Sequence, residues 1–253
     1  MASFTNIRLN HYDFPDTSFF KVDGVITEED VKKINQISKK VFLVLENTRG
    51  QNPSVIRQIH NSNVSISVMG GLNYLKKRKF LSDHYIKRTL YSPDTLGRVI
   101  EVFEKIEKRI RCTWTDRQKA MFVYKELAES LHYKLPTEAD FEDGKDVVRR
   151  LDGLLYGKLV CSGFALVFKE AMDRIGIPCE YQNKSSSHSW NVLFFDGKAY
   201  GVDLTWDCYN KQNNQCGFVY FGLDPDFYQT KHHDISRENE ETQYPLQTFA
   251  KDE

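Results

Sequence analysis

The stretch GKLVCSGFALVFKEAMDRIGIPCEY, residues 157–181, decides the fold of the second half of this chain. Its apolar residues recur at intervals of three and four, which predicts a helix with one buried face. Gly176 followed by Pro178 predicts the end of that helix. Cys161 then lies at the helix N-terminus, where the helix dipole and the unpaired N–H groups lower the pKa of a thiol. The buried face would carry Phe164, Val167, Phe168, Ala171, Met172 and Ile175.

The next decisive stretch is HSWNVLFFDGKAYGVDLTWD, residues 188–207. Trp190–Phe195 and Lys198–Leu204 are predicted to be two strands of a β-hairpin, because Asp196-Gly197 between them is a favoured two-residue turn. A hairpin of this kind fixes which residues face each other across the two strands.

This register places Trp190 opposite Asp203 and His188 opposite Thr205, so the four side chains are expected on one face of the sheet. His188 and Asp203 become diagonal neighbours with Cα atoms about 7–8 Å apart, close enough for a hydrogen bond. The sequence therefore predicts a His–Asp pair.

Cys161, His188 and Asp203 together have the chemistry of cysteine-based acyl transfer. Cys161 attacks a carbonyl carbon, His188 accepts and returns the proton, and Asp203 fixes the tautomer and orientation of the imidazole. A lone cysteine is usually a small buried residue and a lone strand histidine usually has a packing role, but their combination is much rarer. Trp190 and Trp206 are candidates for substrate binding at the wall of this site, with simple packing as the alternative.

These residues resemble the transglutaminase-like cysteine enzymes of papain-like fold. That family has a C-x-G-x-A helix start, an H-x-W-N strand and a D-x-T-W-D strand in this order. The resemblance covers about residues 100–235 and implies that Cys161, His188 and Asp203 form the catalytic triad. The matching segments are Cys161-Ser-Gly-Phe-Ala165, His188-Ser-Trp-Asn191 and Asp203-Leu-Thr-Trp-Asp207.

The sequence also offers candidate roles for several further residues near these motifs. The backbone N–H of Cys161 is a natural oxyanion donor, and either Tyr156 or Trp114 is a candidate for the second donor. Asp207 is predicted to serve a turn beyond the paired strand. Cys112 and Cys179 are interpreted as buried or neutral thiols. A zinc site is not predicted, because the candidate ligands fit no standard spacing: Cys208, Cys216, His232 and His233.

The first part of the chain has a different character. Thr27 and Asp30 predict a helix start with a capping box, and the helix should run to about Lys39. Two strands, a short helix and two longer helices are also predicted. The unit over residues 1–90 is expected to be a small α/β accessory unit, followed by a catalytic domain over residues 91–253. The two predicted strands are Val41–Leu45 and Val64–Val68, and the short helix is Ser54–His60. The longer helices run from Ser92 through Ile110 and from Thr115 onward.

Composition excludes several classes of protein. The 253 residues carry 35 basic and 35 acidic side chains, so no nucleic-acid or polybasic membrane partner is expected. The four basic residues at 76–79 are interpreted as a solvated strand edge or loop. Five cysteines without a C-x-x-C pair fit a reducing compartment, and no leader or membrane span is visible, so a cytoplasmic location is expected.

The sequence therefore predicts an α+β protein in which a helix bearing Cys161 packs on an antiparallel sheet bearing His188 and Asp203. We expect an enzyme that acts on amide bonds of a protein or peptide through a thioester, either hydrolytic or transamidating. The alternative is a non-catalytic scaffold or interaction module of the same fold. No cofactor or metal is expected, and the peptide N-glycanase branch of the family is disfavoured because its paired C-x-x-C module is absent.

Overall fold

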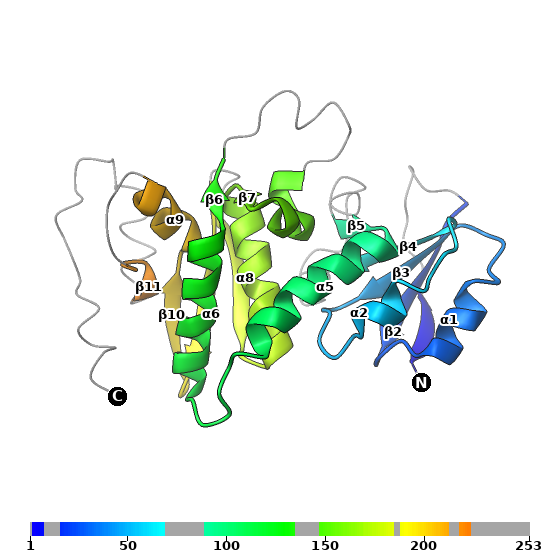
Figure 1. The fold of residues 1–253 in the computed structure, drawn as a ribbon, viewed down its shortest axis with the longest axis horizontal. Helices are drawn as coiled ribbons and strands as arrows, with labels where there is room; N and C mark the ends of the chain where they lie inside the picture. The colour runs from blue at the N-terminus through cyan, green and yellow to red at the C-terminus, as the bar shows by residue number, and fades with distance from the viewer. Residues whose placement is uncertain are drawn as a thin grey trace.

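Two β-sheets and a short two-stranded ladder organise the chain, with the helices packed around them (Figure 1). The computed structural model describes residues 2–7, 16–68, 89–134, 147–184, 188–212 and 218–223. The fold is a mixed α+β fold, in agreement with the class that the sequence predicts.

The N-terminal sheet has the strand order β1-β2-β3-β4-β5. β2, β3 and β4 are parallel to one another, whereas β1 and β5 pair antiparallel at the two edges. β3 is buried along its whole length, as its unbroken apolar sequence requires in the middle of a parallel sheet. The strands are β1 (Ser3–Ile7), β2 (Ser18–Asp23), β3 (Val41–Leu45), β4 (Val64–Val68) and β5 (Leu90–Tyr91).

Two short helices connect the parallel strands. α1 (Glu28–Ile34) starts at the predicted capping box of Thr27 and Asp30, but it ends before Lys39. α2 (Pro53–Ile56) is capped by Asn52 and starts one residue before the predicted helix, but it is shorter because it ends at Arg57. The two predicted strands of this unit, β3 and β4, are confirmed at the predicted residues.

Two longer helices lead from the first sheet to the second. α5 (Pro93–Glu107) starts after the predicted cap Ser92, and α6 (Asp116–Ser130) starts after Thr115, whose side chain forms a capping box with Gln118. Both helix starts are confirmed, because each hydroxyl accepts the N–H group it was expected to cap. α5 packs on α2 and on the 3-10 segment η2 (Leu151–Tyr156), so it touches both halves of the chain.

The second sheet is antiparallel and has the order β11-β10-β9-β8. α8 (Cys161–Ile175) packs against β8 and β9, and it lies between this sheet and the N-terminal unit (Figure 1). A further ladder pairs β6 (His132–Tyr133) with β7 (Lys158–Leu159), close to the start of α8, and η1 (Val147–Arg149) lies beside them. The strands are β8 (Cys179–Lys184), β9 (His188–Phe195), β10 (Lys198–Val202) and β11 (Phe221–Leu223).

The hairpin register is confirmed, but one of its strands is shorter than predicted. Lys198 pairs with Phe195 and Val202 with Asn191, across a turn in which Asp196 and Gly197 both have positive φ. The predicted strand to Leu204 is wrong beyond Val202. α9 (Leu204–Gln212) begins there, so Thr205 lies on a helix and does not face His188 across the hairpin.

The buried side chains of the two halves form one hydrophobic cluster. It runs from Leu43 and Ile66 of the first sheet through Phe103 of α5 to Phe168 of α8 and Leu193 of the second sheet. Because this core is continuous, α8 is held from both sides. α8 itself packs against β8 and β9 of the second sheet and against η1, η2 and α6, and these contacts set the position of its N-terminus.

Candidate active site

Cys161 is the first residue of α8, and the helix around it is formed as its sequence predicts. The predicted apolar face is buried or packed against the core, and the helix ends at Gly176, whose φ of 79° is in the left-handed region. The N-cap residue Val160 makes no side-chain cap hydrogen bond. Cys161 therefore lies at the positive end of the helix dipole, and the side chain of Val160 does not cap that end.

The surroundings of Cys161 favour a thiolate. Burial raises the pKa of the half-buried thiol, but a hydrogen bond and the positive charge of His188 lower it more, and the backbone N–H of Ser189 contributes further. The net pKa is below that of an ordinary cysteine. Cys179, in contrast, is buried away from such partners, and burial raises its pKa.

His188 and Asp203 form the hydrogen bond that the hairpin predicts. Nε2 of His188 donates to Oδ2 of Asp203 at 2.5 Å, and the Asp203 side chain is fully buried. Burial lowers the pKa of His188, but the charge and hydrogen bond of Asp203, followed by those of Cys161, raise it to about 10. The pKa values of the two partners move in opposite directions, and both shifts favour a Cys161 thiolate beside a His188 imidazolium.

Asp203 also starts α9, a role that sequence reasoning missed. Its Oδ1 accepts the backbone N–H groups of Thr205 and Trp206 at 3.0 and 3.3 Å, as an N-cap residue does. One carboxylate therefore both caps a helix and binds the imidazole. This cap is the physical reason why the chain leaves the hairpin at Asp203 instead of continuing as a strand.

Trp190 and Trp206 lie on either side of the candidate triad. The ring of Trp190 is stacked on the ring of His188 with an interplanar angle of 16°, and the centroid of Trp206 lies 5.8 Å from that of His188. Trp190 is buried, whereas Trp206 is half-buried and also contacts Tyr209 and Tyr220. These contacts orient the imidazole ring and cover part of its surface.

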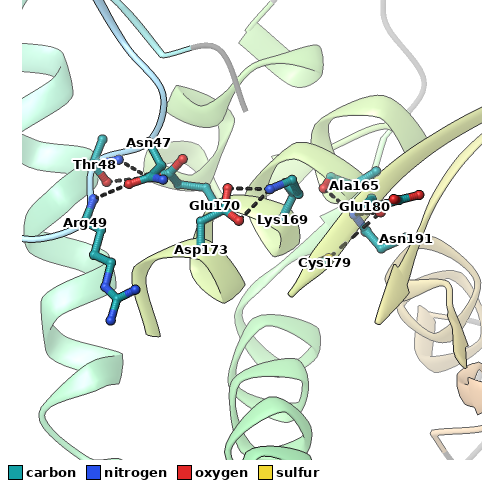
Figure 2. A network of polar contacts seen from close by, with 10 residues as sticks. All are labelled: Asn47, Thr48, Arg49, Ala165, Lys169, Glu170, Asp173, Cys179, Glu180 and Asn191. Carbon is teal, nitrogen blue, oxygen red and sulfur yellow. Dashed lines mark hydrogen bonds and ion pairs between the residues drawn. The ribbon is translucent and has the colours of Figure 1, made fainter. Parts of the chain in front are cut away.

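Asn191 fastens the strand that carries His188 to the helix that carries Cys161. Its side-chain amide donates to the backbone carbonyl of Ala165 on α8 and to that of Glu180 on β8, as Figure 2 shows. The residue is almost fully buried. The H-x-W-N segment thus contains a positioning residue as well as the histidine, although the sequence alone gave Asn191 no role.

The structure corrects the interpretation of Asp207 as a turn residue. It lies in α9, is 2% exposed, and accepts hydrogen bonds from the Tyr124 hydroxyl and from the N–H groups of Val219 and Tyr220. Burial raises its pKa to about 7 in spite of these hydrogen bonds. Tyr124 also donates to the backbone carbonyl of Asp203. The buried network of Tyr124 and Asp207 therefore helps to hold Asp203 in position.

The remaining predicted residues are distributed as follows. Of the two cysteines interpreted as buried or neutral thiols, Cys179 is buried and Cys112 is exposed. Tyr156 is 64% exposed at the end of η2, and Trp114 packs against Phe122.

Of the four candidate zinc ligands only Cys208 lies in the described part of the chain, and the basic residues 76–79 lie outside it. Within the described ranges, no group of three His, Cys, Asp or Glu side chains could hold a metal ion. No helix among the described residues is long and apolar enough to cross a membrane.

Comparison with known proteins adds little to this geometry. No protein family model and no curated protein matches the chain. One solved structure that it resembles is described as "Crystal structure of a TGase", with 18% identity and a TM-score of 0.32. The match covers 44% of this chain and 31% of the other, so this chain spans less than a third of that protein. The function proposed below is therefore based on the site.

Proposed function

We propose that the protein is a transglutaminase-like cysteine enzyme that transfers the acyl group of an amide bond in a protein or peptide to water or to an amine. The hydrogen bond between His188 Nε2 and Asp203 Oδ2, together with the lowered pKa of Cys161, carries this proposal. Cys161, His188 and Asp203 act as the catalytic triad, and Trp190 and Trp206 line the substrate side of the site.

The reaction begins with the thiolate of Cys161. It adds to the carbonyl carbon of the substrate, and the carbonyl electron pair moves to oxygen. Since Nε2 of His188 is bound to Asp203, Nδ1 is the nitrogen available to the sulfur and to the leaving amine. The imidazolium protonates that amine as the C–N bond breaks, which leaves a thioester on Cys161.

The second half of the reaction releases the acyl group. Water or a primary amine gives a proton to the neutral imidazole as it attacks the thioester, and the thiolate leaves. Asp203 holds the ring in the required tautomer through both halves. The surrounding tryptophans strengthen the attraction between the two charges by limiting access of water, although burial itself disfavours each charge.

Thiol labelling tests the nucleophile directly. We expect iodoacetamide to alkylate Cys161 before Cys112, Cys179 or Cys208, most clearly at pH 6, because the lowered pKa leaves Cys161 with more thiolate than an ordinary cysteine. Mass mapping after brief treatment gives the order of reaction. His188→Ala removes the hydrogen bond and the charge, so the labelling at pH 6 should be lost and should return at pH 9.

Cys112 provides the comparison within the same molecule, because it is exposed. If Cys112 is alkylated before Cys161 at pH 6, Cys161 is not an activated nucleophile. The reaction type is tested with casein, with and without a fluorescent primary amine. Covalent amine incorporation indicates transamidation, whereas deamidated glutamine side chains or new peptide ends without incorporated amine indicate hydrolysis. A folded Cys161→Ala variant with full activity would contradict the covalent mechanism, whereas a wild type that forms neither product would favour a scaffold.

A further inference from the structure

Acyl transfer at Cys161 places a negative charge on the substrate oxygen, and this oxyanion needs hydrogen-bond donors. The backbone N–H of Cys161 at the start of α8 can supply one of them. A side-chain donor contributes most where water is excluded, which disfavours the exposed Tyr156. Trp114 precedes α6 in the sequence, and its ring packs against Phe122 of that helix. A half-buried donor on an element that lies against the start of α8 is the better candidate for the second donor.

Tyr133 lies beside the segment that leads into the nucleophile. It pairs with Leu159 in the parallel ladder of β6 and β7, and the next backbone N–H, that of Lys134, donates to the Leu159 carbonyl at 3.0 Å. Leu159 is separated from Cys161 by Val160 alone. The ladder thus fixes Tyr133 next to the N-terminus of α8, independently of any contact of its side chain.

The Tyr133 side chain belongs to the series of rings that reaches His188. Its ring centroid lies 5.9 Å from that of Tyr209, which lies 6.3 Å from Trp206, and Trp206 lies 5.8 Å from His188. This series of edge-on and tilted contacts runs from Tyr133 to the imidazole. Two intervening rings, those of Tyr209 and Trp206, therefore connect Tyr133 to the imidazole of the candidate triad.

The hydroxyl of Tyr133 is also an electrostatic neighbour of the nucleophile. Burial raises its pKa first, the negative charge of Cys161 raises it further, and Arg149 opposes the shift. The hydroxyl therefore stays protonated while Cys161 is a thiolate. A protonated hydroxyl beside a developing negative charge is what an oxyanion donor requires.

We propose that the Tyr133 hydroxyl donates a hydrogen bond to the oxyanion formed when the Cys161 thiolate adds to a carbonyl group. This inference rests on the function proposed above. During addition the C–S bond forms and the carbonyl electron pair moves to oxygen, where Tyr133 and the Cys161 N–H stabilise it. During collapse the C=O bond is restored and the leaving group departs. Tyr133 keeps its proton throughout.

The test separates a reaction that forms an oxyanion from one that does not. Acylation of Cys161 by p-nitrophenyl acetate passes through an oxyanion, whereas alkylation by iodoacetamide is a displacement at carbon and forms none. Tyr133→Phe should slow acylation by roughly 10²-fold. Its rate of Cys161 alkylation should equal that of the wild type. Tyr200→Phe, which removes the hydroxyl of another half-buried tyrosine, is the matched control and should change neither rate.

Each outcome supports or overturns a specific statement. Slower acylation with unchanged alkylation supports the donor role. Equal acylation by Tyr133→Phe and wild type overturns it and leaves the proposed function intact. A parallel loss of both rates also overturns it, because Tyr133 would then act on the thiolate or on folding. If wild-type Cys161 is alkylated but is not acylated, the proposed function fails together with this inference.

Discussion

Asp203 shows how much one buried carboxylate does in this protein. Its Oδ1 caps α9, its Oδ2 binds His188, and its backbone carbonyl accepts the Tyr124 hydroxyl. The helix cap holds the carboxylate in place, so its orientation toward the imidazole needs no further ordering. A residue with two separable roles can be tested with two substitutions.

Asp203→Asn should keep the cap and lose the charge. The amide oxygen still accepts the N–H groups of Thr205 and Trp206, but the imidazole loses its anionic partner and takes up the wrong tautomer. We expect acylation of Cys161 to slow by roughly 10- to 10³-fold, less than the ~10⁴-fold loss of a serine triad because the thiolate is already ionised. The rate of p-nitrophenolate release measures this effect.

Asp203→Ala is the comparison that separates the two roles. It removes the cap as well, so it should lower the free energy of unfolding by about 1 kcal/mol more than the asparagine variant. Urea unfolding of both variants gives this difference. Equal stability of the two variants would mean that the contact to α9 contributes nothing.

At the scale of the element, α8 is positioned by a close approach at its first turn. A Cβ atom at Gly163 would lie 2.3 Å from the backbone carbonyl oxygen of Val148 and 2.8 Å from the Leu159 side chain. Only glycine therefore allows α8 to lie this near η1. The C-x-G segment is explained by packing, since this glycine sets how closely the first turn of α8, which carries Cys161, approaches η1.

Gly163→Ala should displace the start of α8. The clash is with backbone, which cannot move aside as a flexible side chain can, so we expect a loss of about 1–3 kcal/mol in spite of the better helix propensity of alanine. Alkylation of Cys161 at pH 6 should also slow, because the thiol moves away from His188. Thermal unfolding and mass mapping measure the two effects.

Ser162→Ala is the control on the same turn. The Ser162 hydroxyl oxygen is buried and has no hydrogen-bond partner within the described structure, so its removal should leave the stability equal or higher. If both variants lose stability equally, the close approach at Gly163 is not the cause.

At the scale of the whole molecule, the N-terminal unit is bonded to the far end of α8. The backbone N–H and the hydroxyl of Thr48 donate to Oε1 of Glu170 at 2.6 and 2.5 Å, as Figure 2 shows. Arg174, one turn further along, donates to the Thr48 carbonyl and hydroxyl oxygens and forms an ion pair with Glu107 of α5. Three distant segments therefore meet at this helix.

Glu170 makes this contact sensitive to pH. Burial raises its pKa to about 7, with Thr48 and Arg174 opposing and Asp173 adding to the shift. The unfolded chain releases this proton near the ordinary value of 4.5, so the folded state holds an extra proton between these values. The stability that Glu170 gives at low pH is therefore lost as the pH rises from about 4.5 to 7.

Glu170→Gln should remove that dependence, because glutamine imitates the protonated acid. Between pH 5 and 8 the wild type should lose roughly 1–3 kcal/mol more of its unfolding free energy than the variant. Urea unfolding across this range gives both profiles. Glu46→Gln, at an exposed carboxylate two residues before Thr48, should follow the wild type. Parallel profiles for wild type and Glu170→Gln would contradict the buried titration.

The sequence by itself determined the features that depend on neighbours along the chain. The helix that starts at Cys161 follows from periodicity and its glycine end, and the starts of α5 and α6 follow from their caps. The His188–Asp203 hydrogen bond follows from the turn Asp196-Gly197, because a two-residue turn fixes the register of both strands. These features depend on residues close together in the sequence, so they can be predicted from the sequence alone.

Tertiary structure decided what depends on groups that meet from distant segments. The end of β10 at Val202 depends on Asp203 serving α9, and the role of Asp207 depends on Tyr124 and the loop before β11. The same holds for Gly163 against Val148 and for Glu170 against Thr48. Burial and opposing charges set the pKa values at these places. Burial and the distances between these charges cannot be deduced from the spacing of residues in the sequence, because both exist only once the core is packed.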